Sequence, residues 1–289
     1  MGFGFFHRHR GTTPYLLLSP GMLWLAAFFL VPLGFLVYQS LQSGSIVAGF
    51  GFHFTWQWSN YWGAVKGYRG EFERSFIYAG LATLIALVVS YPVAYWIAFR
   101  GGRWKNLLLL FIVAPFFVTY LIRTLAWQTI LADHGLVVRL LTDIHLISPG
   151  GRVLATGTAV VAGITYNFLP FMALPLYVSL EQIDHSLVEA AEDLYASKWV
   201  SFLRVTFPLS LPGVVAGTLL TFIPAAGDFI NATLLGSPTT HMIGNVINSK
   251  FNDLIDYPAA ASMSVILMAI ILAMVLGYAR AVGTEKLTG

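Results

Sequence analysis

Residues 186–212 read SLVEAAEDLYASKWVSFLRVTFPLSLP, and this stretch decides how the rest of the chain is organised. It mixes charged and apolar residues at helical spacing, and long apolar segments precede and follow it. Ser186 and Glu189 have the spacing of a capping box, which predicts a helix with Ser186 as its N-cap. Pro208 and Pro212 predict a break and then the start of a membrane span. We therefore expect a charged helix held between two spans.

One side of this predicted helix is a narrow apolar stripe that contains small residues. The stripe consists of residues three and four positions apart: Leu187, Ala190, Ala191 and Leu194. Small side chains let another surface approach closely, so the stretch is typical of a cytoplasmic platform on which a partner docks. The residues alone are equally consistent with a plain interfacial helix that joins two spans.

The composition predicts an integral membrane protein whose spans pack into one domain. Of the 289 residues, 57% are hydrophobic and 10% are charged, and the mean hydropathy is +0.74. Soluble domains carry about 25% charged residues. The net charge of +3, with no long basic run, argues against nucleic-acid binding. The absence of cysteine excludes disulfides and thiolate metal sites.

The apolar segments predict an all-α, polytopic protein with six transmembrane helices. The predicted spans are 15–41, 75–99, 107–131, 153–180, 211–236 and 259–279. We expect a short N-terminal tail over 1–14, a membrane domain over 15–283 and a C-terminal tail over 284–289. The first apolar run is followed by no convincing cleavage site, so it is expected to stay as a span. The aromatic loop 42–74 suits a membrane–water interface.

Six spans place both termini on one side of the membrane, and the basic residues favour the cytoplasm for that side. The short turn after the second predicted span carries Arg100, Arg103 and Lys105 without any acid. Cytoplasmic loops carry an excess of Lys and Arg. The stretch 186–212 then lies in the cytoplasm as well, and the protein is expected in the cytoplasmic membrane.

Two charged residues, Arg123 and Asp228, lie inside predicted spans. A charge at the centre of a span costs roughly 2.5–3.5 kcal/mol on insertion scales, so each needs a polar setting. The Arg123 side chain is expected to reach an interface or to pair with an acid, with a structural anchor near the outer face as the alternative. Pro224 and Gly227 predict a helix break beside Asp228. Asp228 either faces a path for a cation or caps that break.

The stretch 186–212 resembles the EAA loop of bacterial ABC-importer permeases. The resemblance rests on Glu189-Ala190-Ala191, on Ala196-Ser197-Lys198-Trp199, on Phe202 and Val205, and on Pro208-Leu209-Ser210-Leu211-Pro212-Gly213. In that family the loop, here 182–210, forms a coupling helix that sits in a cleft of the ATPase subunit. The resemblance implies that these residues contact the ATPase: Glu189, Ala190, Ala191, Asp193, Leu194, Tyr195, Ala196, Ser197 and Trp199.

Tyr195 departs from the family pattern, which usually has Gly at this position. Glycine adopts a left-handed turn at little steric cost, whereas tyrosine does not. We therefore expect the helix–turn geometry, or the fit to the ATPase, to differ in this chain.

Further segments resemble the permeases of spermidine/putrescine importers over nearly the whole chain after the N-terminal tail. They are the Arg123–Trp127 segment, residues 169–177, residues 227–229 with 234–236, and residues 242–245. The resemblance implies the MetI-like fold of ABC-importer permeases. It also implies a second, homologous permease subunit, a cytoplasmic ATPase dimer that binds the ATP, and an external substrate-binding protein. Permeases for ferric iron, thiamine and phosphonates are similar, so these substrates remain alternatives.

Residues that suit a cationic substrate are present in the predicted spans. A carboxylate and aromatic faces attract a cation, and a cation–π contact contributes about 0.5–2 kcal/mol. The residues expected on the substrate path are Asp228, Trp127, Tyr166, Phe229 and Arg123.

Other classes of membrane protein fit the sequence less well. A secondary transporter would favour inverted repeats and more intramembrane acids. A membrane enzyme would need a motif such as HExxH or GxSxG, and neither occurs. A purely structural subunit stays open as a third alternative. The chain has no P-loop, so we expect no cofactor of its own and ATP hydrolysis by a partner.

Overall fold

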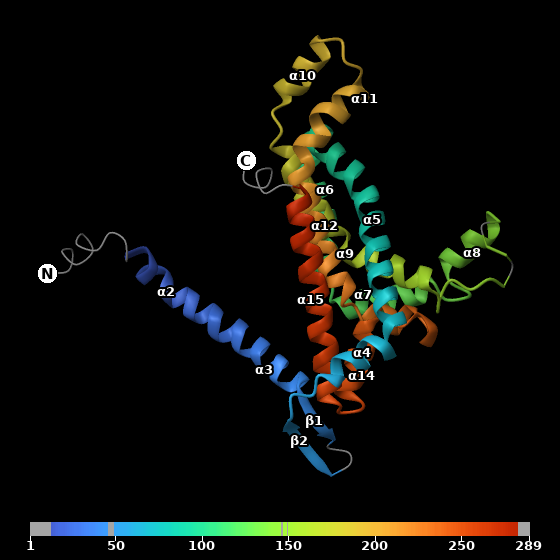
Figure 1. Cartoon of the computed structure of the whole chain (residues 1–289). Helices are drawn as coiled ribbons and strands as arrows, with labels where there is room; N and C mark the ends of the chain where they lie inside the picture. The colour runs from blue at the N-terminus through green and yellow to red at the C-terminus, as the bar shows by residue number, and fades with distance from the viewer. Residues whose placement is uncertain (1–12, 46–48, 146, 149, 283–289) are drawn as a thin grey trace. The chain divides into compact units, whose positions relative to one another are not determined.

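The computed structural model describes residues 13–45, 49–145, 147–148 and 150–282. The chain divides into two compact units (Figure 1). The first contains the residues up to Gly67 together with Lys250–Ile266, and the second contains Tyr68–Ser249 and the residues from Leu267 onward. The predicted tails lie outside the described residues, except that positions 13 and 14 already begin the first helix.

The first unit begins with one long apolar helix, as predicted for residues 15–41. It consists of α2 (Thr13–Leu25), a π-helical turn (Ala26–Leu30) and α3 (Val31–Ser40). The chain then forms an antiparallel hairpin of β1 (Gln42–Ser45) and β2 (Phe50–Phe54), followed by α4 (Ser59–Gly67). The hairpin was not predicted, although Phe50, Phe52 and Phe54 alternate with the period of a strand, because residues 42–74 were interpreted only as an interfacial aromatic loop.

Three helices form the core of the second unit: α5 (Arg69–Arg100), α9 (Gly157–Glu181) and α12 (Phe207–Ala226). Gly213 and Gly217, one turn apart on α12, face α9. A Cβ on Gly213 would lie 2.7 Å from the Pro175 carbonyl oxygen, and one on Gly217 would lie 3.0 Å from that of Met172. Small residues at this spacing let two membrane helices approach closely.

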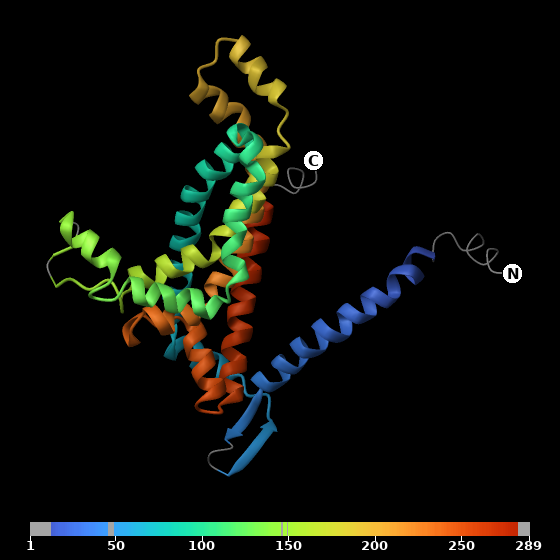
Figure 2. The same ribbon diagram turned by 180° about the vertical axis from the view of Figure 1, so that it is seen from behind.

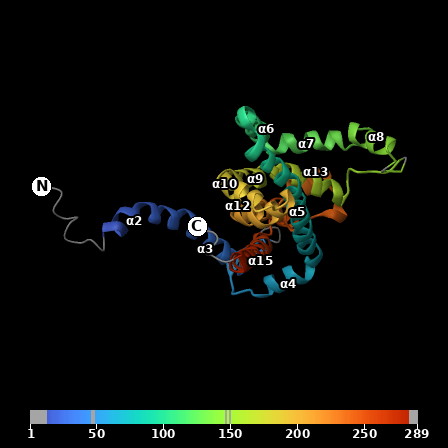
Figure 3. The same ribbon diagram turned by 90° about the horizontal axis from the view of Figure 1, so that it is seen from above.

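The third predicted span, 107–131, is wrong as a single helix. A 3₁₀ turn (Gly102–Trp104) leads into α6 (Lys105–Val113), a second 3₁₀ turn (Ala114–Phe117) and α7 (Tyr120–Ile130), and the two arms are bent by 95°. Val118 is extended, so the helix stops there. Figure 3 shows α6, α7 and the following α8 (Leu136–Asp143) along one edge of this unit.

The fifth predicted span, 211–236, begins earlier and ends earlier than expected. The helix starts with α11 (Lys198–Ser201) and continues through a π-helical turn (Phe202–Thr206) into α12. Because Pro208 stands at the start of α12, directly after the π turn, the predicted break there does not occur. The break beside Gly227 is confirmed, and the short α13 (Ile230–Leu235) follows it.

The remaining predicted spans are confirmed with longer or shifted ends. They are α5, α9 and α15 (Tyr257–Val282), and α15 is preceded by a 3₁₀ turn (Pro238–Thr240) and α14 (Ile243–Asn252). By length and hydropathy, five described helices are able to cross a membrane, and the bent pair makes a sixth if it counts as one span.

Candidate functional site

The predicted coupling stretch folds as two helices joined by a tight turn, not as one helix. The first is α10 (His185–Asp193), and its N-cap is Asp184 rather than the predicted Ser186. The Asp184 carboxylate accepts the Ser186 backbone N–H at 2.9 Å. This hydrogen bond lowers the pKa of Asp184 below its ordinary value. The capping box with Glu189 is therefore a wrong prediction, because an acid two residues earlier caps the helix.

Tyr195 adopts the left-handed conformation that the sequence led us not to expect. Its φ is 60°, and the turn has the hydrogen bonds of a Schellman motif. The Tyr195 N–H donates to the Glu192 carbonyl at 2.9 Å, and the Ala196 N–H donates to the Ala191 carbonyl at 3.1 Å. The two bonds hold the backbone in place despite the Cβ. Ser197 then caps α11 by accepting the Val200 N–H at 3.4 Å.

The residues expected to contact the ATPase form an outward surface, which we call the coupling surface. It comprises Glu189, Ala190, Ala191, Asp193, Leu194, Tyr195, Ala196, Ser197 and Trp199. Ala191 and Ala196 are half-buried and the others are exposed, with 82% of Leu194, 98% of Tyr195 and 67% of Trp199 accessible. Large exposed apolar side chains gathered on a charged hairpin are typical of a protein–protein contact.

Asp228 lies in the break between α12 and α13 and is only 7% exposed. Its carboxylate accepts the Tyr120 hydroxyl at 2.6 Å and the Asn231 side-chain amide. It also accepts the Asn231 backbone N–H at 3.1 Å, which caps the first turn of α13. Asp228 therefore has the capping role that the sequence left open, and its hydrogen bonds join the break to α7.

More polar groups extend this contact into α9, and we call the whole set the polar cluster. Asn167 on α9 donates to the Thr124 hydroxyl at 3.1 Å and to the Asn231 side-chain oxygen at 3.2 Å. A Cβ on Gly163 would meet the side chains of Asn231 and Leu235, so this glycine makes room for the cluster. The members of the polar cluster are Tyr120, Thr124, Asn167, Asp228 and Asn231.

Sequence reasoning identified only Asp228 among these residues. Asn167 and Asn231, both almost fully buried, were available signals, since an amide inside an apolar span needs a hydrogen-bond partner. Asn167 on α9 bonds to Asn231 on α13 and to Thr124 on α7. The position of α7 depends on the bend before it, which was not predicted.

Arg123 forms no ion pair with an acid in the described part of the chain. It is 9% exposed, and its guanidinium lies 5.5 Å from the centre of the Phe116 ring and 5.7 Å from that of Tyr120. Its Nε and Nη1 atoms are buried without a hydrogen-bond partner among the described residues. Tyr120 thus contacts both intramembrane charges, with its ring on Arg123 and its hydroxyl on Asp228.

The aromatic residues expected on the substrate path fall into separate places. Trp127 and Tyr166 contact each other, with ring centres 5.4 Å apart, and both are half-buried. Phe229 follows Asp228 in the break and is 38% exposed. The structure therefore brings Arg123 and Asp228 together through Tyr120 and pairs Trp127 with Tyr166.

Residues 90–282 match the family described as the binding-protein-dependent transport system inner membrane component. The broken membrane helices and the exposed helix pair of α10 and α11 are consistent with this class, the permease of a transport system. The chain belongs to this family of inner-membrane transport components.

Curated relatives make the comparison closer. The spermidine/putrescine transport system permease protein PotB of Haemophilus influenzae is 38% identical over 203 residues, which is 70% of this chain and 71% of that protein. PotB of Escherichia coli strain K12 is 39% identical over 201 residues, 70% of this chain and 73% of the relative.

Solved structures share the fold at low sequence identity. A chain of a bacterial ABC transporter that imports alginate aligns with a TM-score of 0.71 at 17% identity, over 98% of both chains. A chain of the MetNI methionine ABC transporter aligns with a TM-score of 0.57 at 15% identity, over 73% of this chain and 93% of that chain. The predicted ABC-importer permease fold is therefore confirmed.

Proposed function

We propose that this chain is one permease subunit of an ATP-driven importer of polyamines such as spermidine and putrescine. The proposal of a polyamine substrate rests on the 38–39% identity to the PotB proteins over 70% of the chain. The partners are a second, homologous permease, an ATPase dimer that binds the ATP, and an external binding protein. Both termini face the cytoplasm.

The coupling surface is the part that we assign to the ATPase. Its large side chains Leu194 and Tyr195 are almost fully exposed, and Trp199 is 67% exposed although its ring stacks on Phe202. ATP binding closes the ATPase dimer and moves α10 and α11. Because α9 leads into α10 and α11 continues into α12, this movement reaches the membrane core directly. Charge reversal by Glu189→Arg is expected to uncouple transport from hydrolysis or to prevent docking.

The polar cluster is the part that we assign to the substrate path, together with Trp127, Tyr166, Phe229 and Arg123. An ammonium group of a polyamine would take the place of the Tyr120 hydroxyl on the Asp228 carboxylate. Asp228→Asn keeps the shape of this side chain but removes its charge. We expect weaker uptake by a complex that still assembles, and unchanged uptake would remove Asp228 from the path.

An importer of an anionic substrate, such as a phosphonate, is the second candidate. Arg123 favours it, because two buried N–H groups of its guanidinium lack a partner among the described residues. A charged donor of this kind binds an anion strongly.

The test is the ATPase activity of the reconstituted complex with its binding protein. The candidate substrates are spermidine, putrescine, ferric iron, thiamine and a phosphonate. Selective stimulation by a polyamine is the expected result. Stimulation by an anion or a metal instead would change the proposed substrate but leave the assignment as an ATP-driven importer in place. Failure to find any ATPase that binds the chain would overturn the coupling assignment itself.

A further inference from the structure

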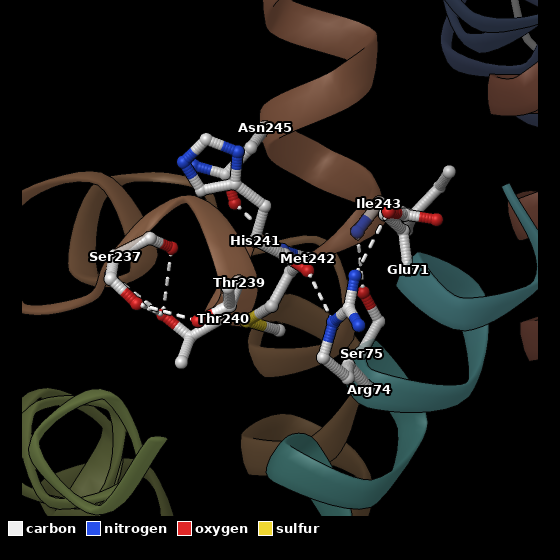
Figure 4. Close-up of polar contacts among 10 residues, drawn as sticks. All are labelled: Glu71, Arg74, Ser75, Ser237, Thr239, Thr240, His241, Met242, Ile243 and Asn245. Carbon is white, nitrogen blue, oxygen red and sulfur yellow. Dashed lines mark hydrogen bonds and ion pairs between the residues drawn. The ribbon is translucent and has the colours of Figure 1, made fainter. Parts of the chain in front are cut away.

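The segment between α13 and α14 is held against the start of α5, and this attachment has no role in the function proposed above (Figure 4). Arg74 on α5 donates through Nε to the His241 carbonyl at 2.9 Å. The next residue, Ser75, accepts the Ile243 backbone N–H through its hydroxyl at 2.8 Å. Glu71, one turn earlier, accepts from the Arg74 guanidinium at 2.9 Å and fixes its direction. We call these contacts the α5 attachment.

Asn245 connects the α5 attachment to the helix break at Asp228, between α12 and α13. Its side-chain oxygen accepts the Met242 N–H at 2.9 Å, which closes the turn before α14. Its side-chain amide donates to the Phe229 carbonyl at 3.0 Å and to the Thr233 hydroxyl at 2.7 Å. The same residue therefore holds the attached segment and both ends of the first turn of α13.

Gly244 makes this contact closer still. A Cβ at this position would lie 2.5 Å from the Gly227 carbonyl oxygen and 3.1 Å from that of Asp228. The start of α14 therefore rests directly on the backbone of the break. A six-residue helix such as α13 does not hold its own conformation, so its position is set by these neighbours.

The other end of α5 contacts the start of α10 and the chain that follows α11, namely the π-helical turn and the start of α12. The Phe99 ring meets the His185 ring edge-on with centres 5.0 Å apart, and the Tyr95 ring meets Phe202 at 5.9 Å. The Tyr91 hydroxyl is 2.7 Å from that of Ser210. Figures 1 and 2 both show this end of α5 directly below α10 and α11.

α5 is one uninterrupted helix of 32 residues between these two sets of contacts. At 1.5 Å per residue, the distance from Ser75 to Phe99 is about 36 Å along the axis. Pro92 lies inside α5 and removes one of its backbone hydrogen bonds, but the helix continues through it to Arg100. A helix that continues in this way transmits a shift along its axis, because its length is fixed by its remaining backbone hydrogen bonds.

We propose that α5 links the coupling surface to the Asp228 break, so that Arg74, Ser75 and Asn245 are positioning residues of the transport pathway. Movement of α10 and α11 on ATP binding reaches Phe99 through His185 and Tyr95 through Phe202, shifts α5, and displaces the break through the α5 attachment. This link is additional to the direct continuity of α9 and α12 with the hairpin. It rests on the coupling role proposed above but does not depend on the identity of the substrate.

The first experiment measures hydrogen exchange of residues 227–235 in the assembled complex, with and without a non-hydrolysable ATP analogue. We expect ATP to change the exchange rate in the wild type. Arg74→Gln, which removes the charged donor to His241, should reduce that change about tenfold. Arg74→Lys keeps a donor and should restore most of it. This readout needs no substrate, so it stands even if polyamines fail to stimulate the ATPase.

The matched control is Arg69→Gln. Arg69 lies on the same helix and pairs with Glu73 at 2.6 Å, but it is solvent-exposed. Arg69→Gln should leave the ATP-dependent change in the hydrogen exchange of residues 227–235 as it is in the wild type. Equal responses in Arg74→Gln and Arg69→Gln would overturn the proposal. If Arg74→Gln fails to assemble, Ser75→Ala, which removes a single acceptor, takes its place with the same expected direction.

The second experiment is a double-mutant cycle between the two ends of α5, read out as ATPase stimulation by the loaded binding protein. Phe99→Leu keeps an apolar side chain but removes the ring contact with His185, and Trp96→Leu on the same helix is its control. If α5 is the link, Arg74→Gln and Phe99→Leu interrupt the same connection, so the double variant should be no worse than the stronger single variant. Multiplied effects would show two independent routes and would contradict the proposal.

Discussion

The side chains of the polar cluster find their partners within the chain, whereas most side chains of the coupling surface are exposed. In the polar cluster, Asp228, Tyr120 and Asn231 are buried or half-buried and bond to one another. On the coupling surface, Leu194 and Tyr195 are exposed and contribute nothing to the packing of their own chain. A substitution in the first region should therefore act on folding, and one in the second should act on assembly. The following predictions test that difference.

The largest expected effect is that of Asp228→Leu on the stability of the chain itself. The change leaves the Tyr120 hydroxyl, one N–H of the Asn231 side-chain amide and the Asn231 backbone N–H without the acceptor that Asp228 provides. Each orphaned buried donor costs about 1–3 kcal/mol, so the free energy of unfolding should fall by about 3 kcal/mol or more. Thermal unfolding of the purified subunit in detergent measures this. A stability within error of wild type would show that the cluster does not hold the break.

Leu194→Ser should have the reverse effect: it should weaken assembly with the ATPase without lowering the stability of the subunit. Because 82% of Leu194 is exposed, the stability of the isolated subunit should not change. Loss of an apolar contact at the centre of an interface should weaken ATPase binding by about tenfold, which titration of the ATPase onto the reconstituted permease measures. Leu125→Ser, at an exposed position of α7 outside the hairpin, is the control for binding. Unimpaired ATPase binding would remove Leu194 from the interface.

Arg123→Met sharpens the comparison inside the buried region. Unlike Asp228, Arg123 has buried N–H groups without a partner among the described residues. Replacing an uncompensated buried charge by an apolar side chain of similar length is expected to raise the stability of the isolated subunit by about 1 kcal/mol. Thermal unfolding of the isolated subunit shows whether its stability rises or falls. A loss would mean that the contacts with the Phe116 and Tyr120 rings outweigh the burial of the charge.

Tyr195→Gly separates backbone strain from contact on the exposed side. A left-handed residue with a Cβ costs roughly 1–2 kcal/mol, so glycine should stabilise the turn by about 1 kcal/mol. Tyr195→Ala keeps the strain and removes the ring, and it should not stabilise. Hydrogen exchange of the amides at 194–197 measures the turn. If both variants weaken ATPase binding equally, the Tyr195 ring itself makes the contact.

The smallest expected effect is a pH dependence of α10. The pKa of Asp184 is lowered by its bond from the Ser186 N–H, so the carboxylate stabilises α10 at pH values above the ordinary carboxyl pKa. This contribution should be lost as the pH falls through the lowered pKa. Asp184→Asn should retain the cap and lose this pH dependence. Hydrogen exchange of residues 186–190 against pH is the measurement, and an unchanged pH profile in Asp184→Asn would contradict the assignment.

The sequence predicted the coupling surface better than the polar cluster, and the reason is physical. The order of residues 189–199 is a local pattern, which can be recognised without knowing which distant residues it meets. The contact between Tyr120 and Asp228 joins positions 108 residues apart and depends on the 95° bend before α7. Pro115 signalled a disturbance in that span, but no local pattern gives the direction in which the chain turns.

The same distinction explains the two errors within the hairpin. Ser186 and Asp184 are both good N-caps, and α10 begins at His185, so that the Asp184 carboxylate and not the Ser186 hydroxyl stands at the N-cap position. Tyr195 takes a left-handed conformation because the bonds to Ala191 and Glu192 outweigh its intrinsic preference. Propensity alone does not include those bonds.

The shortness of α7 and α13 has a consequence for the biogenesis of the protein. A span needs about 20 residues to cross the hydrocarbon layer, whereas α7 has 11 and α13 has 6. Neither can be stable in lipid alone, because the break beside each exposes backbone groups that lipid does not satisfy. During synthesis α7 leaves the ribosome before Asn167 and long before Asp228. Its contacts with Asn167 and Asp228 therefore cannot form until α9 and α13 have been synthesised, which makes closure of this region a late step in the maturation of the subunit.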